Sequence, residues 1–231
     1  MPASRMGIEA IIFDCDGTIL DNELVIEKAT LKVLAEHGII ICQDDLLPFV
    51  GFPGREVFSH FLKRDGKSAD PEVHVEECIQ KRRAVIKARN SEAMRPVPGV
   101  VEFIQGLNGY RMAVAGGYGQ QYLEEALRAL GIYEKFDVII AGEQAPRKPA
   151  PDIYLLTAKC LGVKPENCLV IENSPTGIQS AKSAGMYCIA ITAGLPQNYS
   201  HEKLRNAGVD GIVATFAELG KRLMRDQMND L

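Results

Sequence analysis

The chain has 231 residues, of which 46% are hydrophobic and 24% are charged, and its formal net charge is −4. This composition is typical of a globular protein and excludes a disordered or fibrous chain. The net negative charge excludes a broad basic surface for nucleic acid or anionic membrane, so an anionic ligand would have to be held by a local cluster of donors. The length suits one large domain or a domain that carries an insertion.

The first predicted strand, residues 8–13, leads directly into Asp14 and Asp16. Successive strand side chains point to opposite faces, so the two carboxylates are expected on one side, and Gly17 lets the chain turn away after them. Two carboxylates are costly to bury without a cation or a hydrogen-bond network. The pair therefore indicates a functional site, and the alternative at this point is an acidic strand exit into a polar loop.

Residues 22–92 carry three or four helical patterns and no convincing strand. The sequence "RPVPGV", residues 95–100, is a stiff turn suited to a return hinge, and α/β alternation resumes after it. This arrangement predicts a helical insertion directly after the first strand. Helices in that place can close over the strand tip as a lid.

Four further short apolar runs predict strands at residues 111–116, 136–142, 167–173 and 186–192. Amphipathic helical patterns lie between them, and the one at residues 120–132 places Leu123, Ala126, Leu127 and Leu130 on one face and ends at Gly131. Alternating strands and helices predict a parallel sheet in an α/β sandwich. Ligands in such sheets bind beyond the carboxyl ends of the strands, where Asp14 and Asp16 are expected.

Three more segments are expected at the same edge of the sheet. Lys148 stands in a loop before a helix, so its ammonium group is expected to be partly exposed and to reach an anion rather than to support the fold. Glu172 and Asn173 end a late strand. Gly116 and Gly117 follow another strand, where free N–H groups at the start of the next helix would form a phosphate-binding pocket.

In this order, the segments "DCDGT", "KPAPDIY" and "ENSPTGIQSAKSAGM" resemble those of the haloacid dehalogenase-like hydrolase superfamily, over nearly the full chain. The helical insertion is similar to the cap of the subgroup that contains phosphoglycolate phosphatase, sugar phosphatases and β-phosphoglucomutase. The resemblance implies a Rossmann-like α/β core of residues 1–21 and 93–231 with an inserted helical cap of residues 22–92.

The resemblance also implies the chemistry of a magnesium-dependent phosphatase. Asp14 would attack phosphorus to form an aspartyl-phosphate, and Asp16 would act as the general acid and then as the base. Lys148 would offset negative charge. Mg²⁺ would be held by the Asp14 side chain, the main-chain carbonyl of Asp16 and the pair Glu172 and Asn173. The implied substrate is a small phosphorylated metabolite, with neither nucleic acid nor membrane as a partner.

Two positions depart from the family pattern. Active members usually carry Ser or Thr where Gly116 stands, and a second acid where Asn173 stands. Loss of the hydroxyl donor and of one carboxylate predicts reduced activity and weaker binding of Mg²⁺. A catalytically impaired protein that binds a phosphorylated ligand is the alternative function. Gly116→Ser is expected to raise turnover only if the backbone tolerates a side chain there.

Three further residues bear on the substrate and reaction. Arg55 stands in a loop resembling one that touches the distal part of the substrate in relatives, although a plain exposed arginine at a helix start is equally compatible. β-Phosphoglucomutase carries a histidine where Ile26 stands, which disfavours a mutase. True dehalogenases lack the acid that corresponds to Asp16, which disfavours dehalogenation.

The six cysteines form no CxxC pair and no zinc-ligand spacing with the four histidines, which favours buried thiols in a reducing compartment. The N-terminal stretch does not resemble a secretory signal, and no apolar run approaches the length of a membrane span. A cytoplasmic protein is therefore expected, either as a monomer or as a homodimer.

Overall fold

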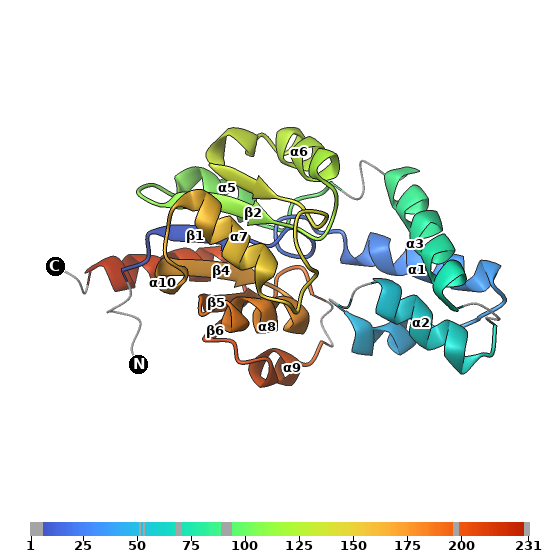
Figure 1. The fold of residues 1–231 in the computed structure, drawn as a ribbon. Helices are drawn as coiled ribbons and strands as arrows, with labels where there is room; N and C mark the ends of the chain where they lie inside the picture. The colour runs from blue at the N-terminus through green and yellow to red at the C-terminus, as the bar shows by residue number, and fades with distance from the viewer. Residues whose placement is uncertain are drawn as a thin grey trace. The chain divides into compact units, whose positions relative to one another are not determined.

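The computed structural model describes residues 7–50, 52, 54–67, 71–88, 94–195 and 199–228. The chain forms two compact units, one of Met1–Asp21 with Pro96–Leu231 and the other of Asn22–Arg95 (Figure 1). We call them the core unit and the cap unit. The cap unit is thus an insertion after the first strand of the core unit.

A six-stranded sheet forms the centre of the core unit, in the order β3-β2-β1-β4-β5-β6. Its strands are β1 (Ala10–Phe13), β2 (Arg111–Ala115), β3 (Val138–Ile140), β4 (Cys168–Glu172), β5 (Tyr187–Ile191) and β6 (Gly211–Val213). Every neighbouring pair is parallel, which confirms the predicted α/β class. The strand β6 was not predicted, because its apolar run is only Ile212 and Val213 after a glycine.

Helices cover both faces of this sheet (Figure 1). One face carries α7 (Asp152–Leu161), α8 (Pro175–Ser183) and α9 (His201–Asn206), and the other carries α5 (Val100–Gly106) and α10 (Phe216–Met228). Phe13 of β1 packs edge-on against Phe103, whose ring in turn lies 5.2 Å from that of Phe216. All four residues of β1 are buried because the strand is covered on both sides, which explains its continuous apolar sequence.

The helix α6 (Gln120–Ala129) confirms the amphipathic pattern that predicted it. Leu123, Ala126 and Leu127 are fully buried. Gly131 follows the C-terminal end of the helix, and its φ of 68° is the left-handed conformation that suits glycine. The N–H groups of Gly131 and Ile132 then bond to carbonyls of the last helical turn. Local sequence therefore determines both the buried face and the end of this helix.

The sheet order reverses at β1, which pairs with β2 on one side and with β4 on the other. In α/β sheets the crevice beyond the carboxyl ends of the strands at such a switch point is the usual ligand site. The chain leaves and re-enters the core unit beside this place, since Leu20 pairs with Pro96 and the N–H of Val97 donates to Ile19. Asp14 follows β1 immediately and so lies at the switch point.

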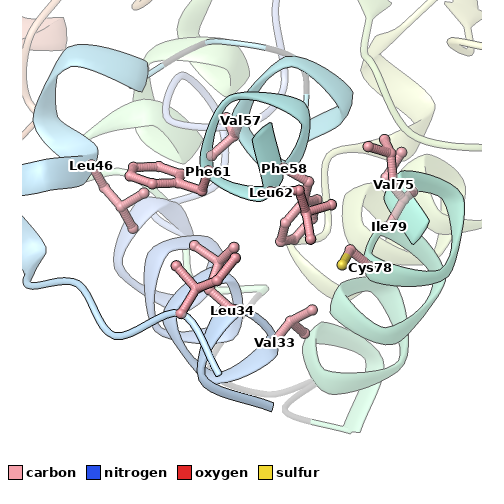
Figure 2. Close-up of a cluster of buried hydrophobic side chains, with 11 residues drawn as sticks. Val33, Leu34, Leu46, Val57, Phe58, Phe61, Leu62, Val75, Cys78 and Ile79 are labelled. Carbon is pink, nitrogen blue, oxygen red and sulfur yellow. The ribbon is translucent and has the colours of Figure 1, made fainter. Parts of the chain in front are cut away.

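The cap unit contains α1 (Glu23–Glu36), the 3₁₀ helix η2 (Gln43–Phe49), α2 (Gly54–Arg64) and α3 (Pro71–Ala88). No strand occurs among the described residues of this unit, in agreement with the prediction. Its helices enclose a hydrophobic cluster of their own (Figure 2), formed by Val33, Leu34, Ile39, Leu46, Val57, Phe58, Phe61, Leu62, Val75, Cys78 and Ile79. Within the described part of the chain, no helix is both long and apolar enough to cross a membrane.

Candidate active site

Asp14 and Asp16 stand at the carboxyl end of β1, as the sequence predicted. The N–H of Asp14 donates to the carbonyl of Ile171 at 2.9 Å, which continues the pairing of β1 with β4. Immediately after it, the carbonyl of Cys15 accepts hydrogen bonds from Ile19 and Leu20 in a tight turn. Gly17 has a φ of 74° in this turn. The turn keeps Asp14 buried, while Asp16 lies outside the strand and is partly exposed.

Lys148 is the centre of an ion-pair network. Its Nζ lies 2.5 Å from Asp14 Oδ1, 2.8 Å from Glu172 Oε1 and 3.2 Å from the carbonyl oxygen of Ala115. An ammonium group has three protons, so these three acceptors use all of them. The side chain is only 14% exposed. Lys148 is therefore partly exposed, as expected, but the ends of β1, β2 and β4 close around its ammonium group, and the sequence did not predict these contacts.

Glu172 is buried and has hydrogen-bond donors at both of its carboxylate oxygens. Oε1 accepts from Lys148 and from the hydroxyl of Tyr154, each at 2.8 Å. Oε2 accepts from the N–H groups of Asn173 and Ser174 and from the hydroxyl of Ser174, at 2.9 to 3.0 Å. A Cβ atom on Gly177 would lie 1.7 Å from Oε1, so only glycine lets this carboxylate rest on the first turn of α8.

The electrostatics of the network follow from one ammonium group facing two buried carboxylates. Burial and the charge of Glu172 raise the pKa of Asp14 to about 8, against the lowering effect of Lys148. Burial would also raise the pKa of Glu172, but the charge of Lys148 and its hydrogen bonds hold that pKa below its usual value. Burial alone would lower the pKa of Lys148, yet the two carboxylates raise it. The raised pKa of Asp14 shows that a second negative charge is disfavoured here, and a bound cation would compensate that charge.

The loop after β2 differs from the predicted phosphate pocket. The N–H of Gly116 donates to Ile140 in the sheet, and the N–H of Gln120, the first residue of α6, donates to the Glu143 carboxylate at 3.0 Å. These two N–H groups are therefore not free, because a distant segment supplies their acceptors. The exposed Gly117 is different: its N–H donates to no other described residue. The N–H of Gly117 can therefore donate to an anion here.

Gly116 lies in tight surroundings. Its φ is not in the left-handed region, so the backbone conformation would accept a side chain. A Cβ atom there would, however, lie 2.7 Å from Leu123 Cδ2 and 3.2 Å from Cys15 Cβ. Leu123 is fully buried and fills the space in which a serine or threonine side chain at this position would begin.

The remaining predicted residues lie at two places. Asn173 is buried at the start of α8, next to Glu172. Arg55 belongs to α2 of the cap unit, where its guanidinium pairs with Glu76 at 3.0 Å and both side chains are about half exposed. The core unit thus brings Asp14, Lys148 and Glu172 into direct contact, and Arg55 pairs within its own unit.

Three further residues, Tyr154, Ser174 and Gly177, support the network and were not predicted from the sequence. Tyr154 is fully buried, and its ring lies 4.7 Å from the ammonium nitrogen of Lys148. The sequence did point to this part of the chain, since these residues stand inside the segments "KPAPDIY" and "ENSPTG" that carry the resemblance to the hydrolase superfamily. Their roles depend on contacts between segments, which residue spacing alone does not reveal.

The residues present can be compared with the needs of Mg²⁺, which prefers oxygen ligands. Among the described residues, no group of three or more His, Cys, Asp or Glu side chains is arranged to hold a metal ion. The hydrogen bonds of Glu172 already use both of its oxygens. The other oxygen donors of the predicted set are the Asp14 carboxylate, the main-chain carbonyl of Asp16 and the amide oxygen of Asn173. These are suitable oxygen donors for Mg²⁺, with less charge than a site of several carboxylates.

Comparison with known proteins identifies the family. Residues 11–191 match the family of haloacid dehalogenase-like hydrolases. The chain belongs to this family. The match includes Asp14, Lys148 and Glu172, so the contacts described above lie within the part of the chain that is shared with other haloacid dehalogenase-like hydrolases.

Several haloacid dehalogenase-like hydrolases and related proteins are similar over most of their length. Fructose-1-phosphate phosphatase YqaB of Escherichia coli (strain K12) is 31% identical over 183 residues, which are 78% of this chain and 95% of that protein. Protein CbbY of Cereibacter sphaeroides is 35% identical over 227 residues, 92% of this chain and 94% of that protein.

A crystal structure of CbbY from Rhodobacter sphaeroides in complex with xylulose-(1,5)-bisphosphate is similar in fold, with a TM-score of 0.75. It is 31% identical and covers 92% of this chain and 96% of that chain. β-Phosphoglucomutase from Clostridium difficile has a TM-score of 0.74 at 26% identity, covering 96% of this chain and 98% of that chain. The family's fold with an inserted cap is therefore shared along nearly the whole chain.

Proposed function

We propose that the protein is a Mg²⁺-dependent phosphatase that hydrolyses a small phosphomonoester, such as a sugar phosphate. The observation that carries this proposal is the Asp14 carboxylate at the carboxyl end of β1, held by Lys148 at the point where the sheet order reverses. The names of similar proteins support the substrate class, since they include a fructose-1-phosphate phosphatase and a phosphorylated carbohydrates phosphatase.

In this proposal, Asp14 attacks phosphorus and the bond to the leaving oxygen breaks, so that two easier steps replace one difficult hydrolysis. Lys148 orients Asp14, because the ion pair fixes Oδ1 and leaves Oδ2 for the attack. Asp16 gives a proton to the leaving oxygen and then takes one from the attacking water. Asp16 is suited to this exchange because it is partly exposed, whereas Asp14 is buried.

The other groups would bind the phosphoryl oxygens and the cation. The exposed N–H of Gly117 would donate to a phosphoryl oxygen. Asp14, the carbonyl of Asp16 and Asn173 would hold Mg²⁺, which would offset the negative charges of the carboxylate and the phosphate. We propose that Glu172 contributes by fixing Lys148 rather than as a direct ligand, because its hydrogen bonds already occupy both oxygens. Arg55 remains a candidate for contact with the distal part of the substrate.

Release of inorganic phosphate from a panel of phosphorylated sugars and polyols, with and without Mg²⁺, tests the proposal. Metal-dependent release by the parent protein that Asp14→Asn removes is the expected result. The second candidate is a protein that binds phosphorylated ligands without turnover, and Gly116 and Asn173 favour it. A ligand that raises the melting temperature but is never hydrolysed would identify that function and overturn the first.

The amide at Asn173 predicts a high Mg²⁺ requirement. Asn173→Asp adds a carboxylate to the donor set, so the Mg²⁺ concentration for half-maximal phosphate release should fall roughly threefold or more. Asn206→Asp is the matched control, because it adds the same charge to an exposed position in α9 and should leave the titration unchanged. A parent protein that saturates at micromolar Mg²⁺, with no tightening in Asn173→Asp, would show that the amide is an adequate ligand.

The contact between Gly116 and Leu123 predicts that a hydroxyl at position 116 needs a second change. Gly116→Ser alone should destabilise the protein without raising turnover, because its Cβ would meet a fully buried side chain. Leu123→Val removes the two δ-carbons that lie closest. We expect Gly116→Ser with Leu123→Val to turn over roughly tenfold faster than Leu123→Val alone, since one donor to the phosphoryl group is gained.

A double-mutant cycle in both stability and turnover checks this prediction. The two changes should be more favourable together than the sum of their separate effects. Additive losses in stability, with no gain in turnover, would show that position 116 does not face the phosphoryl group.

A further inference from the structure

The segment that follows β3, residues 141–144, lies against the loop that follows β2, residues 116–119. The N–H of Gly142 donates to the carbonyl of Tyr118 at 2.9 Å. The contact of Gly142 with the backbone of Gly117 is so close that a Cβ atom on Gly142 would lie 2.4 Å from the Gly117 carbonyl oxygen. Glu143 adds a third contact, since its Oε1 accepts from the N–H of Gln120 at 3.0 Å.

These contacts fix the peptide groups on both sides of the Gly117 N–H. The preceding N–H, that of Gly116, is bonded to Ile140. After Gly117, Gly142 lies against the carbonyl of Gly117 and bonds to that of Tyr118. Glu143 then holds the N–H at which α6 begins. The N–H of Gly117 lies between these fixed points and donates to no other described residue.

We infer that Glu143, together with Gly142, is a positioning residue for the phosphoryl group, acting through the Gly117 N–H. The inference rests on the proposed function, which assigns this N–H to the phosphoryl oxygens. Phosphate binding depends more strongly on this N–H because Gly116 has no hydroxyl that could donate to the phosphoryl group. A fixed donor strengthens anion binding since its orientation costs no entropy when the ligand arrives.

Two features of Glu143 have opposite effects on an anion, and they can be separated. Its carboxylate accepts the hydrogen bond of Gln120, which orders the loop, and its negative charge repels a phosphate. Glu143→Gln keeps an oxygen acceptor and removes the charge, whereas Glu143→Ala removes both. If the hydrogen bond is the important feature, Glu143→Ala must bind phosphate more weakly than Glu143→Gln.

The test uses the full chain in Mg²⁺, with inorganic phosphate as the probe in calorimetric titration, and the best phosphomonoester for kinetics. Glu143→Ala should raise the Kd for phosphate and the KM about fivefold, the effect of one lost hydrogen bond, with a smaller change in kcat. Glu143→Gln should stay within about twofold of the parent. The matched control is Glu134→Ala, which removes an exposed carboxylate from η3 (Tyr133–Lys135). It should change neither the Kd for phosphate nor the KM.

Gly142→Ala is the second variant, and it should weaken phosphate binding more than Glu143→Ala because its Cβ must displace the Gly117 backbone. Equal phosphate affinity in the parent, Glu143→Ala and Gly142→Ala would overturn the inference and leave the proposed function standing. Equal effects of Glu143→Gln and Glu143→Ala would also overturn it, since charge would then be the cause. A parent protein that neither binds nor releases phosphate would overturn the proposed function and the inference together.

Discussion

Asp14→Asn is expected to reduce phosphate release by a factor of about 10⁴ or more, the loss typical when a nucleophile is removed. The amide keeps the size of the side chain but cannot attack phosphorus. The folded structure should remain, because the substitution leaves the ammonium of Lys148 facing one buried carboxylate, Glu172, instead of two. The variant should therefore melt at the temperature of the parent or above it in metal-free buffer.

Phosphate release and thermal unfolding of Asp14→Asn, measured on the same preparation, check both parts of this prediction. Asp137→Asn is a suitable control, since it changes the same residue type at the exposed ion pair with Arg111 in the core unit and should retain activity. Full activity of folded Asp14→Asn would remove the nucleophile from the proposed mechanism. A large loss of stability would mean that Lys148 needs both carboxylates for the fold.

Lys148→Met is expected to lower stability as well as activity, whereas the sequence alone predicted a lysine that acts on an anion without supporting the fold. Asp14 and Glu172 would then face each other without a cation, and their side chains are only 12% and 1% exposed. Removing one partner from a buried ion pair typically costs about 3–5 kcal/mol. For a chain of this length the melting temperature should fall by roughly 10 °C.

The matched control for this prediction is Lys182→Met. Lys182 also pairs with one carboxylate, Asp210, and donates to one carbonyl, that of Met186, but its side chain is 31% exposed. This substitution should cost about 1 kcal/mol or less. Adding Asp14→Asn to Lys148→Met should restore part of the lost stability if repulsion between the carboxylates is the cause. If Lys148→Met melts within about 2 °C of the parent, the lysine interacts with the anion but does not stabilise the fold.

The parts of the fold that sequence predicted well are those determined locally. Continuous apolar runs identified five strands because a parallel sheet is covered on both faces. The buried face and the end of α6 followed from the spacing of its leucines and from Gly131. The strand β6 was missed because it contributes only two apolar residues after a glycine, whereas the equally short β3 lies inside a longer apolar run.

The parts of the site that sequence did not predict depend on contacts between distant segments. Lys148 was predicted to reach an anion from a loop, but its contacts with Asp14 and Glu172 were not predicted, because they form only where the ends of three strands meet. The start of α6 looked open to an anion, but its first N–H is bonded to a carboxylate 23 residues away in the chain. Gly116 suggested a simple loss of a hydroxyl, whereas Leu123 occupies the space. Spacing along one chain contains none of this information.

The central claim is that Asp14 carries the phosphoryl group during turnover. The most direct measurement is rapid acid quenching of the parent protein during hydrolysis of its best substrate, followed by proteolysis and mass spectrometry of the peptide that contains Asp14. We predict a phosphorylated peptide with the modification on Asp14, formed and lost at rates compatible with phosphate release and absent from Asp14→Asn. Sustained phosphate release without phosphorylation of Asp14, or with the modification on another residue, would contradict the account.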